Sequence, residues 1–254
     1  MQYGAITGYI DVAQVALYAF WLFFAGLVFY LRREDKREGY PLVTERPGYT
    51  LAGFPVPPSP KTFLLADGRT VLAPRPEETE PAFQAVPVAR FPGAPQHPVG
   101  NPMLSAAGPA AYALRDAKPD ILQEFNSDRI VPLRVATAYH VDEEGPNPIG
   151  QEVIAADGVT AGTVVDLWID LAESSVMYLE VEVTGGRRVL VPKPLVRVVT
   201  SGVAFVESVL ASQFADAPVP ANPDRVTLRE EDQIQAYFSS GHMYATADRM
   251  GPLL

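Results

Sequence analysis

Cysteine is absent from this chain of 254 residues, and histidine occurs only three times. Without cysteine, the chain cannot form disulfides, thiolate metal sites or a catalytic thiol. Glycine-rich phosphate-binding loops and the G-x-S-x-G nucleophile motif are also missing. His97, His140 and His242 lie far apart without the spacing of metal ligands, so structural or solvated roles suit them better. We therefore expect a protein that is not an enzyme and that binds no cofactor or metal by itself.

An excess of basic residues is lacking as well. The chain has 20 Lys and Arg against 30 Asp and Glu, which gives a formal net charge of −10 and a pI near 4.8. Because binding to a phosphate backbone requires a positive surface, we expect no nucleic-acid partner.

One long apolar run stands near the N-terminus. Residues 12–31, VAQVALYAFWLFFAGLVFYL, contain a single strongly polar side chain, that of Gln14. As a helix rising about 1.5 Å per residue they reach about 30 Å, the thickness of a bilayer's hydrocarbon core. The run predicts one transmembrane helix over residues 12–31.

The basic residues around this run predict its orientation. Residues 1–11 contain no Lys or Arg, whereas Arg32, Arg33, Lys36 and Arg37 follow the run at once. Basic flanks stay cytoplasmic, so residues 1–11 face outward and the rest of the chain lies in the cytoplasm. A cleaved signal peptide fits less well, because it needs positive charge before a shorter apolar core. Residues 32–38 carry charges of both signs. They form a solvated turn, or they contact lipid head groups or the acidic surface of a neighbouring subunit.

Residues 32–110 form a proline-rich segment, with 15 of the chain's 25 prolines between Pro41 and Pro109. Proline fixes φ and removes a donor, which excludes regular helix or central strand here. A small hairpin around Asp67-Gly68 is predicted within residues 63–73. The segment carries too many apolar residues for a free linker, so we expect it to extend over a partner's surface. These residues are Phe54, Phe63, Leu64, Leu65, Val71, Phe83 and Phe91.

The remaining chain, residues 111–254, reads as a mainly-β domain with C-terminal helices. Alternating apolar residues predict half-buried antiparallel strands over 163–171 and 176–184. Turns at Asp157-Gly158 and Gly185-Gly186, with further strands at 188–191, 195–199 and 203–206, complete the pattern. Five or six such strands predict a small, closed or nearly closed antiparallel barrel over about 130–207.

Two helices are expected after the barrel. Val206, Val209, Leu210 and Phe214 have helical spacing, and Thr227-x-x-Glu230 is a capping box for a second helix that ends near Gly241.

Acidic residues gather on the two long strands. Asp166, Asp170 and Glu173 lie at the end of the first, and Glu180 and Glu182 share the outward side of the second. A solvated acidic face is the simpler interpretation. The alternative is a set of carboxylates that exchange protons, because burial and like charges raise a carboxyl pKa towards neutrality.

Trp168 falls on the same outward side, where a large aromatic needs cover. A partner surface and a loop of the same chain are both possible covers.

A series of motifs, in their order along the chain, resembles the H subunit of the photosynthetic reaction centre of purple bacteria. The predicted barrel is similar to the PRC-barrel module. The resemblance runs from end to end of the chain. It rests on LRREDKREGYPL (31–42), PKTF (60–63), GNPM (100–103), GPAAY (108–112), NPIG (147–150), AGTVVDLWID (161–170), TLREEDQI (227–234) and MYAT (243–246).

The resemblance implies a single-pass protein of the bacterial inner membrane with a periplasmic N-terminus. Such subunits cap the L and M subunits on the cytoplasmic side, shield the secondary quinone site and assist proton transfer to the reduced quinone. The bacteriochlorophyll, bacteriopheophytin, quinones and non-haem iron belong to the partner subunits. A cytochrome subunit, a light-harvesting antenna and membrane lipids are further partners it suggests.

The resemblance also assigns roles to residues. Asp170 and Glu173 match the family's proton-transfer carboxylates. The stretch 123–129 lacks the histidines that family members carry at the proton entrance, so Glu124, Asp128 or His140 are candidates for that place. The expected partner interface includes Arg32, Arg33, Tyr40 and Trp168.

Two other functions remain open at this stage. The chain could be a membrane-tethered adaptor whose barrel binds an unrelated protein. It could also be a tethered relative of a ribosome-maturation module that contains the same barrel, although this needs a basic surface that an acidic chain lacks.

Overall fold

The computed structural model describes residues 4, 6–7, 9–43, 50–51, 53–66, 68–75, 84–91, 93–124, 126–142, 144–199 and 202–250. The chain divides into two compact units, Met1–Thr79 and Glu80–Leu254. Asp67, Phe83 and residue 125 of the stretch 123–129 lie outside the described residues. The boundary between the units falls inside the proline-rich segment 32–110.

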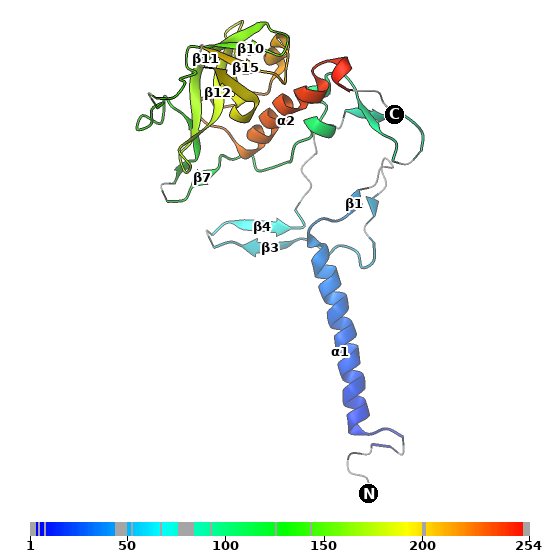
Figure 1. Ribbon diagram of the computed structural model, residues 1–254. Helices are drawn as coiled ribbons and strands as arrows, with labels where there is room; N and C mark the ends of the chain where they lie inside the picture. The colour runs from blue at the N-terminus through cyan, green and yellow to red at the C-terminus, as the bar shows by residue number, and fades with distance from the viewer. Residues whose placement is uncertain are drawn as a thin grey trace. The chain divides into compact units, whose positions relative to one another are not determined.

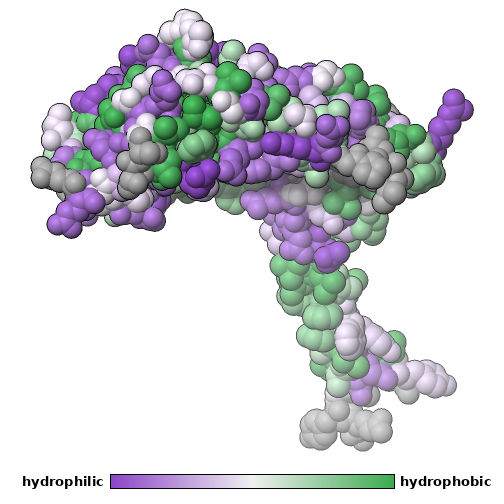
Figure 2. Space-filling model, turned by 45° about the horizontal axis from the view of Figure 1, so that its top comes forward, coloured by the Kyte–Doolittle hydropathy of each residue, from purple (hydrophilic) through white to green (hydrophobic). Residues whose placement is uncertain are grey.

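The first unit contains the predicted apolar helix, α1 (Val12–Glu34). This helix (Figure 1) is long and apolar enough to cross a membrane, and hydrophobic residues cover much of its surface (Figure 2). Asp11 caps its N-terminus by accepting from the Gln14 amide at 2.7 Å, while the Asp11 amide donates to the Gln14 side chain at 3.2 Å. The one polar residue of the run therefore satisfies backbone groups at the helix start.

Short strands follow α1 within the first unit. β1 (Leu42–Val43) pairs with β2 (Thr50–Leu51), and β3 (Lys61–Leu64) pairs antiparallel with β4 (Thr70–Ala73). The β3–β4 pair confirms the predicted hairpin, whose turn includes Gly68 at φ +82°. Only glycine adopts such a positive φ without strain.

The second unit begins with short ladders and turns. These are β5 (Ala85–Pro87) with β6 (Gln96–Pro98), the 3₁₀ turns η2 (Pro102–Leu104) and η3 (Gly108–Ala110), and β7 (Ile121–Leu122) with β8 (Ser127–Asp128). β5 and β6 each end at a proline, which cannot donate to a ladder.

A seven-stranded sheet forms the centre of the second unit, in the order β13-β12-β11-β10-β15-β14, with β9 also paired to β11. The mainly-β prediction is confirmed, and the long strands lie close to their predicted positions. One pair departs from the prediction: β10 and β15 are parallel, so the sheet is not wholly antiparallel. The strands are β9 (Ile130–Pro132), β10 (Glu152–Ala155), β11 (Thr160–Asp170), β12 (Ser175–Val183), β13 (Arg188–Pro192), β14 (Val196–Val199) and β15 (Val203–Val206).

The alternation predicted for the long strands is only partly correct. Leu179, Val181 and Val183 are buried as predicted, but Tyr178 and Glu180 on the other side of β12 are buried too. The register between β11 and β12 also shifts twice along β11, which changes the side to which its residues point. Other parts of the chain therefore cover both faces of these strands.

The helices after the sheet differ from the prediction in extent. Residues 206–214 do not form an α-helix: β15 ends at Val206, and the 3₁₀ helix η5 (Ala211–Asp216) follows. The C-terminal helix α2 (Leu228–Tyr244) begins at the predicted Thr227 cap but continues past Gly241. A Cβ at Gly241 would lie 2.4 Å from the Ser208 carbonyl oxygen, so this glycine allows α2 to approach the backbone closely. A last 3₁₀ turn, η6 (Ala247–Met250), follows.

Candidate functional site

Strand β9 brings two arginines to the end of β11. β9 pairs antiparallel with the last three residues of β11, and Arg129 and Arg134 stand just before and just after it. The ladder continues beyond β9, since the Leu171 amide donates to the Arg129 carbonyl and the Leu133 amide to the Leu167 carbonyl. Antiparallel pairing therefore places one arginine beside Asp170 and the other beside Asp166.

The Arg129 cluster consists of Arg129, Asp120, Asp170 and Glu173. Arg129 Nε and Nη2 lie 2.8 and 2.7 Å from Asp170 Oδ2, and Nη2 lies 3.2 Å from Glu173 Oε1. Arg129 Nη1 lies 3.3 Å from Asp120 Oδ2. The Asp170 side chain is 3% exposed and that of Glu173 is 66% exposed. One guanidinium thus joins a buried carboxylate to one at the surface.

The electrostatics of Asp170 contradict one sequence-based expectation. Burial favours a higher pKa for this carboxyl, but hydrogen bonds from Arg129 and from the amides of Ala172 and Glu173 outweigh burial and lower the pKa below its ordinary value. The expectation of a raised pKa is therefore wrong for Asp170. The hydrogen bond to Asp170 in turn raises the pKa of Arg129. Both groups are held in their charged forms.

The Arg134 cluster consists of Arg134, Asp166, Glu180 and Asp224. Arg134 Nη1 lies 2.8 Å from Asp166 Oδ2 and 2.5 Å from Glu180 Oε2, and Nε lies 2.8 Å from Asp224 Oδ1. Arg134 also donates to the Pro223 carbonyl. The hydrogen bonds that Arg134 donates to Glu180, Asp224 and Asp166 together outweigh burial, the largest single influence, and raise the pKa of the guanidinium.

Trp168 is covered by its own chain, which corrects the expectation of an outward aromatic at a partner interface. Its side chain is 1% exposed, and its indole Nε1 donates to Glu180 Oε2 at 2.9 Å. The Arg134 guanidinium lies 6.0 Å from the ring centroid. Trp168 and Glu180 line a small cavity of about 200 Å³ together with residues 219–223.

The solvated acidic face is also wrong for most of its members. Asp166, Asp170 and Glu180 are 8%, 2% and 3% exposed, and each is paired with arginine. Buried carboxylates need such partners, because an isolated buried charge is very costly. Glu182 does lie at the surface, where it pairs with Arg188 at 3.3 Å.

The three candidates for the proton entrance do not form one group. Asp128 accepts from Arg225 Nε at 2.6 Å and is 16% exposed at its side chain. Glu124 and His140 are exposed. Within the described part of the chain, no group of three or more His, Asp or Glu could hold a metal ion.

The expected interface residues of the first unit lie at or just after the end of α1. Arg32 and Arg33 are exposed, and Arg32 Nη1 lies 3.7 Å from Asp35 Oδ2. Tyr40 is half-buried beneath Lys36, whose Nζ lies 4.8 Å from the ring centroid. Their role at an interface stays a prediction.

A further carboxyl, Glu231 at the start of α2, was not identified from the sequence. Tyr178 Oη donates to Glu231 Oε2 at 3.2 Å. Burial raises the pKa of Glu231, and the charges of Asp120 and Asp232 add to this effect, while Tyr178 and Arg115 act against it. Asp120 also belongs to the Arg129 cluster, so the Glu231 charge is coupled to that cluster.

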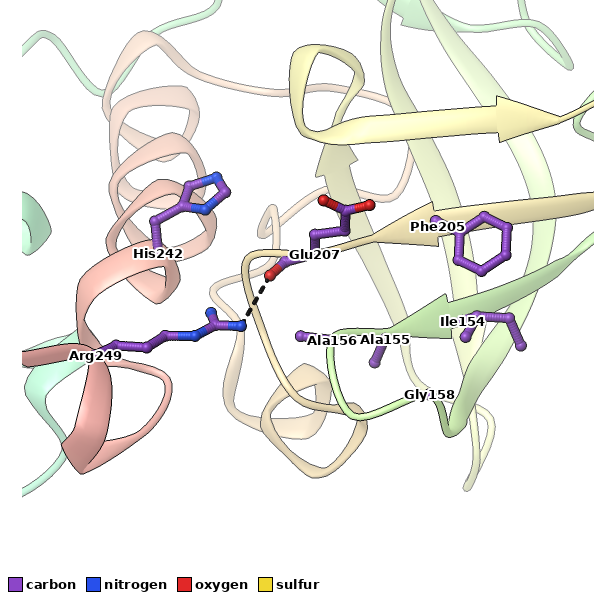
Figure 3. A pocket seen from close by; sticks show the side chains of 8 residues that line it. All are labelled: Ile154, Ala155, Ala156, Gly158, Phe205, Glu207, His242 and Arg249. Atoms are coloured by element: carbon purple, nitrogen blue, oxygen red, sulfur yellow. Dashed lines mark hydrogen bonds between the residues drawn. The ribbon is translucent and has the colours of Figure 1, made fainter.

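A pocket in the described residues lies between the ends of β10 and β15 and the C-terminal part of the chain (Figure 3). It has a volume of about 590 Å³ and is lined by Ile154, Ala155, Ala156, Gly158, Phe205, Glu207, His242 and Arg249. Arg249 donates to the carbonyls of Ser208, Gly241 and Glu207 at 2.7, 2.9 and 3.2 Å. Three backbone acceptors fix this guanidinium, so we assign it the structural task of holding η6.

Arg129 and Arg134 are the functional residues that the sequence reasoning missed. The available signal was their position on either side of a short apolar strand, in a chain whose acidic strand residues require cations. This signal does not show which acid each arginine contacts, because Arg129 and Asp170 are 41 residues apart in the chain and Arg134 and Asp166 are 32 residues apart.

Two protein-family models match the chain. The model for the photosynthetic reaction centre H-chain N-terminal region matches residues 4–135, more than half of the chain. The model for the PRC-barrel domain matches residues 140–208, which span β10 to β15. The first match ends at residue 135, shortly after β9, the strand that Arg129 and Arg134 flank.

Proposed function

Since the chain belongs to the family of photosynthetic reaction-centre H chains, and is thus a subunit that associates with the reaction-centre core, we propose that it caps the cytoplasmic face of the L and M subunits and shields the secondary quinone site. The family is one of structural subunits and not of classical enzymes. Together with α1, it indicates a single-pass protein of the inner membrane. The pigments, quinones and iron would belong to the L and M subunits.

The charge distribution supports a cytoplasmic location for the second unit. All the basic residues near the span lie at the C-terminal end of α1, and two of them, Arg32 and Arg33, are exposed there. Lys and Arg beside a span remain on the cytoplasmic side. The N-terminus would accordingly be periplasmic.

Glu173 is the carboxylate that we assign to proton exchange. Its side chain is 66% exposed and is held by one contact with Arg129. Such a group can meet water on one side and remain fixed in position on the other. A proton taken up at the surface would pass by way of Glu173 and water to carboxylates of the neighbouring subunit.

Asp170 has a different part in this proposal. It is buried, makes two contacts with Arg129 and has a lowered pKa. A carboxyl that stays ionised is a poor carrier for a proton near neutral pH. We therefore assign Asp170 to positioning: it fixes Arg129, which fixes Glu173. The single observation that carries the proposal is this link between a buried and an exposed carboxylate in a reaction-centre subunit.

Flash spectroscopy of the intact complex tests the proposal. We expect Glu173→Gln to slow the proton-coupled second electron transfer by about tenfold or more, since proton transfer by a placed group is worth about 10²–10⁴ in rate. Primary charge separation should keep its rate. Asp170→Asn should slow the same step less and change its pH profile, because Arg129 would lose the buried charge that fixes it.

Glu182→Gln is the matched control. Glu182 is another surface carboxylate paired with arginine, at 3.3 Å from Arg188, but it lies outside the Arg129 cluster. This variant should leave the second electron transfer unchanged. Equal rates for Glu173→Gln and the wild type would refute the assignment of Glu173.

A further inference from the structure

The β3–β4 hairpin is fixed to the end of α1 by charged side chains. Glu34 accepts from Arg37 Nε at 2.7 Å and from Lys61 Nζ at 2.9 Å. Arg37 Nη1 also donates to the carbonyls of Ser59 and Ala73 at 2.9 and 2.8 Å. Arg37 lies in the 3₁₀ turn η1 (Asp35–Arg37) directly after α1, so the chain just before β3 and the end of β4 are bound to the end of the helix. The hairpin projects sideways from this end (Figure 1).

The direction of Lys61 shows which face of the hairpin turns towards the span. Lys61 Nζ lies 5.9 Å from the ring centroid of Tyr30, a residue of the apolar run. The register pairs Lys61 with Ala73 and Phe63 with Val71. Because alternate residues of a strand share a face, Phe63 and Val71 lie on the same face as Lys61.

The opposite face of the hairpin is apolar as well. It carries Leu64 opposite Thr70 and Leu72 opposite Thr62. Phe63 and Leu64 are 44% and 76% exposed. A two-stranded hairpin is at best marginally stable in water, so such exposed apolar side chains indicate a surface that is covered by something else.

A second aromatic residue lies at the level of the span. The Phe54 ring centroid is 5.8 Å from that of Phe29, which belongs to the apolar run, and Phe54 is 86% exposed. Phe29 and Tyr30 stand about one helical turn before Glu34, or about 5–8 Å along the axis. Phe54 and the Lys61 face are therefore held at the depth where the apolar run gives way to charged residues.

We infer that the hairpin face carrying Phe63 and Val71, together with Phe54, rests on the membrane interface beside α1. Aromatic residues favour this level, and lysine reaches from it towards water and lipid phosphates, as Lys61, whose side chain is 50% exposed, is placed to do. The hairpin is a lateral lipid contact of the subunit, and its Leu64 face points away from the bilayer. This inference rests on the proposal that α1 spans the membrane.

Spin labels can test the inference directly, because the chain has no cysteine of its own. Phe63→Cys and Val71→Cys place a nitroxide on the Lys61 face, and Leu64→Cys and Leu72→Cys place it on the opposite face. Leu22→Cys, within α1, is the reference for a lipid-embedded site. Each full-length chain is labelled, assembled with the other reaction-centre subunits and placed in nanodiscs of phosphatidylcholine and phosphatidylglycerol. Collision rates with oxygen, which concentrates in the bilayer, and with a water-soluble nickel chelate are then measured.

We expect the ratio of oxygen to nickel collisions to be higher at positions 63 and 71 than at positions 64 and 72, and to approach that at position 22. Equal ratios on the two faces would overturn the inference. So would protection of position 63 from both reagents, which would show a protein surface there. A label at position 22 that is open to the nickel chelate would instead refute the transmembrane placement of α1, and with it the proposed function.

Discussion

Replacing Arg134 by methionine tests whether the Arg134 cluster stabilises the fold. Arg134→Met removes the guanidinium between Asp166 and Glu180, whose side chains are 11% and 4% exposed. Methionine keeps much of the side-chain length but leaves both carboxylates without this cation. The cost arises because a buried charge without its partner is far less stable than the pair.

The structure gives the magnitude. Removing one partner of a buried ion pair costs about 3–5 kcal/mol. We take the lower end, about 3 kcal/mol, because Arg134 is 33% exposed and Glu180 keeps contacts with Arg188 at 3.3 Å and with Trp168 at 2.9 Å. At roughly 2–4 °C per kcal/mol for a domain of this size, Tm should fall by about 6–12 °C.

The assay is thermal unfolding of the full chain in detergent micelles, followed by tryptophan fluorescence. Trp21→Phe in every variant leaves Trp168 as the sole reporter, since the chain has two tryptophans. The matched control is Arg197→Met: Arg197 and its partner Glu207 are 58% and 69% exposed, so the loss should be about 0–1 kcal/mol. A Tm for Arg134→Met as close to wild type as that of the control would refute the reasoning. Adding Asp166→Asn and Glu180→Gln to Arg134→Met should restore part of the stability, because the two buried carboxylates of the cluster then carry no unpaired charge.

Other expectations concern pH, packing and metal inhibition. Burial is the main cause that raises the pKa of Glu231 above its ordinary 4.5, so the folded chain keeps this proton at pH values where the unfolded chain has lost it, and the free energy of unfolding falls as pH rises from 4.5 through the raised value. Urea titrations at several pH values should show that Glu231→Gln abolishes this fall. Asp170 has the opposite sign, since its lowered pKa stabilises the fold above 3.8 and this stability is lost as pH falls through the folded value; Asp170→Asn should remove that acid-side loss in the same titrations. At an exposed helix position, replacing glycine by alanine stabilises by up to about 1 kcal/mol. Gly241→Ala should instead lower Tm by several degrees, because the new Cβ would lie 2.4 Å from the Ser208 carbonyl oxygen, and a raised Tm would contradict this close packing. Zn²⁺ should inhibit proton uptake only weakly, since the described residues offer no cluster of metal ligands and His140 stands apart from the other histidines; inhibition at micromolar Zn²⁺ that His140→Ala leaves intact would reveal a site elsewhere on this chain or on its partners.

Features governed by neighbouring residues were predictable from the sequence. The apolar run gives α1, the glycine turn gives the β3–β4 hairpin, and the Thr227 capping box gives the start of α2. Each depends on residues only a few positions apart, so periodicity and capping rules are sufficient.

Features governed by distant contacts were not predictable. Trp168 and Glu180 are buried, and residues 219–223, about 40–55 positions later in the chain, line the same cavity. The pKa of Asp170 falls because Arg129, 41 residues earlier, lies beside it. Alternation along a strand shows which residues share a face, but a tertiary contact decides whether that face meets water.

Reconstitution of a reaction-centre core that lacks this chain tests the central claim most directly. The core is isolated without the chain, and the rate of second electron transfer to the secondary quinone is recorded as purified full-length chain is added. We expect the wild-type chain to bind and accelerate this step while primary charge separation keeps its rate, and the Glu173→Gln chain to bind equally but to accelerate the step much less. A chain that fails to bind the core, or that binds and leaves the second electron transfer unchanged, would contradict the account.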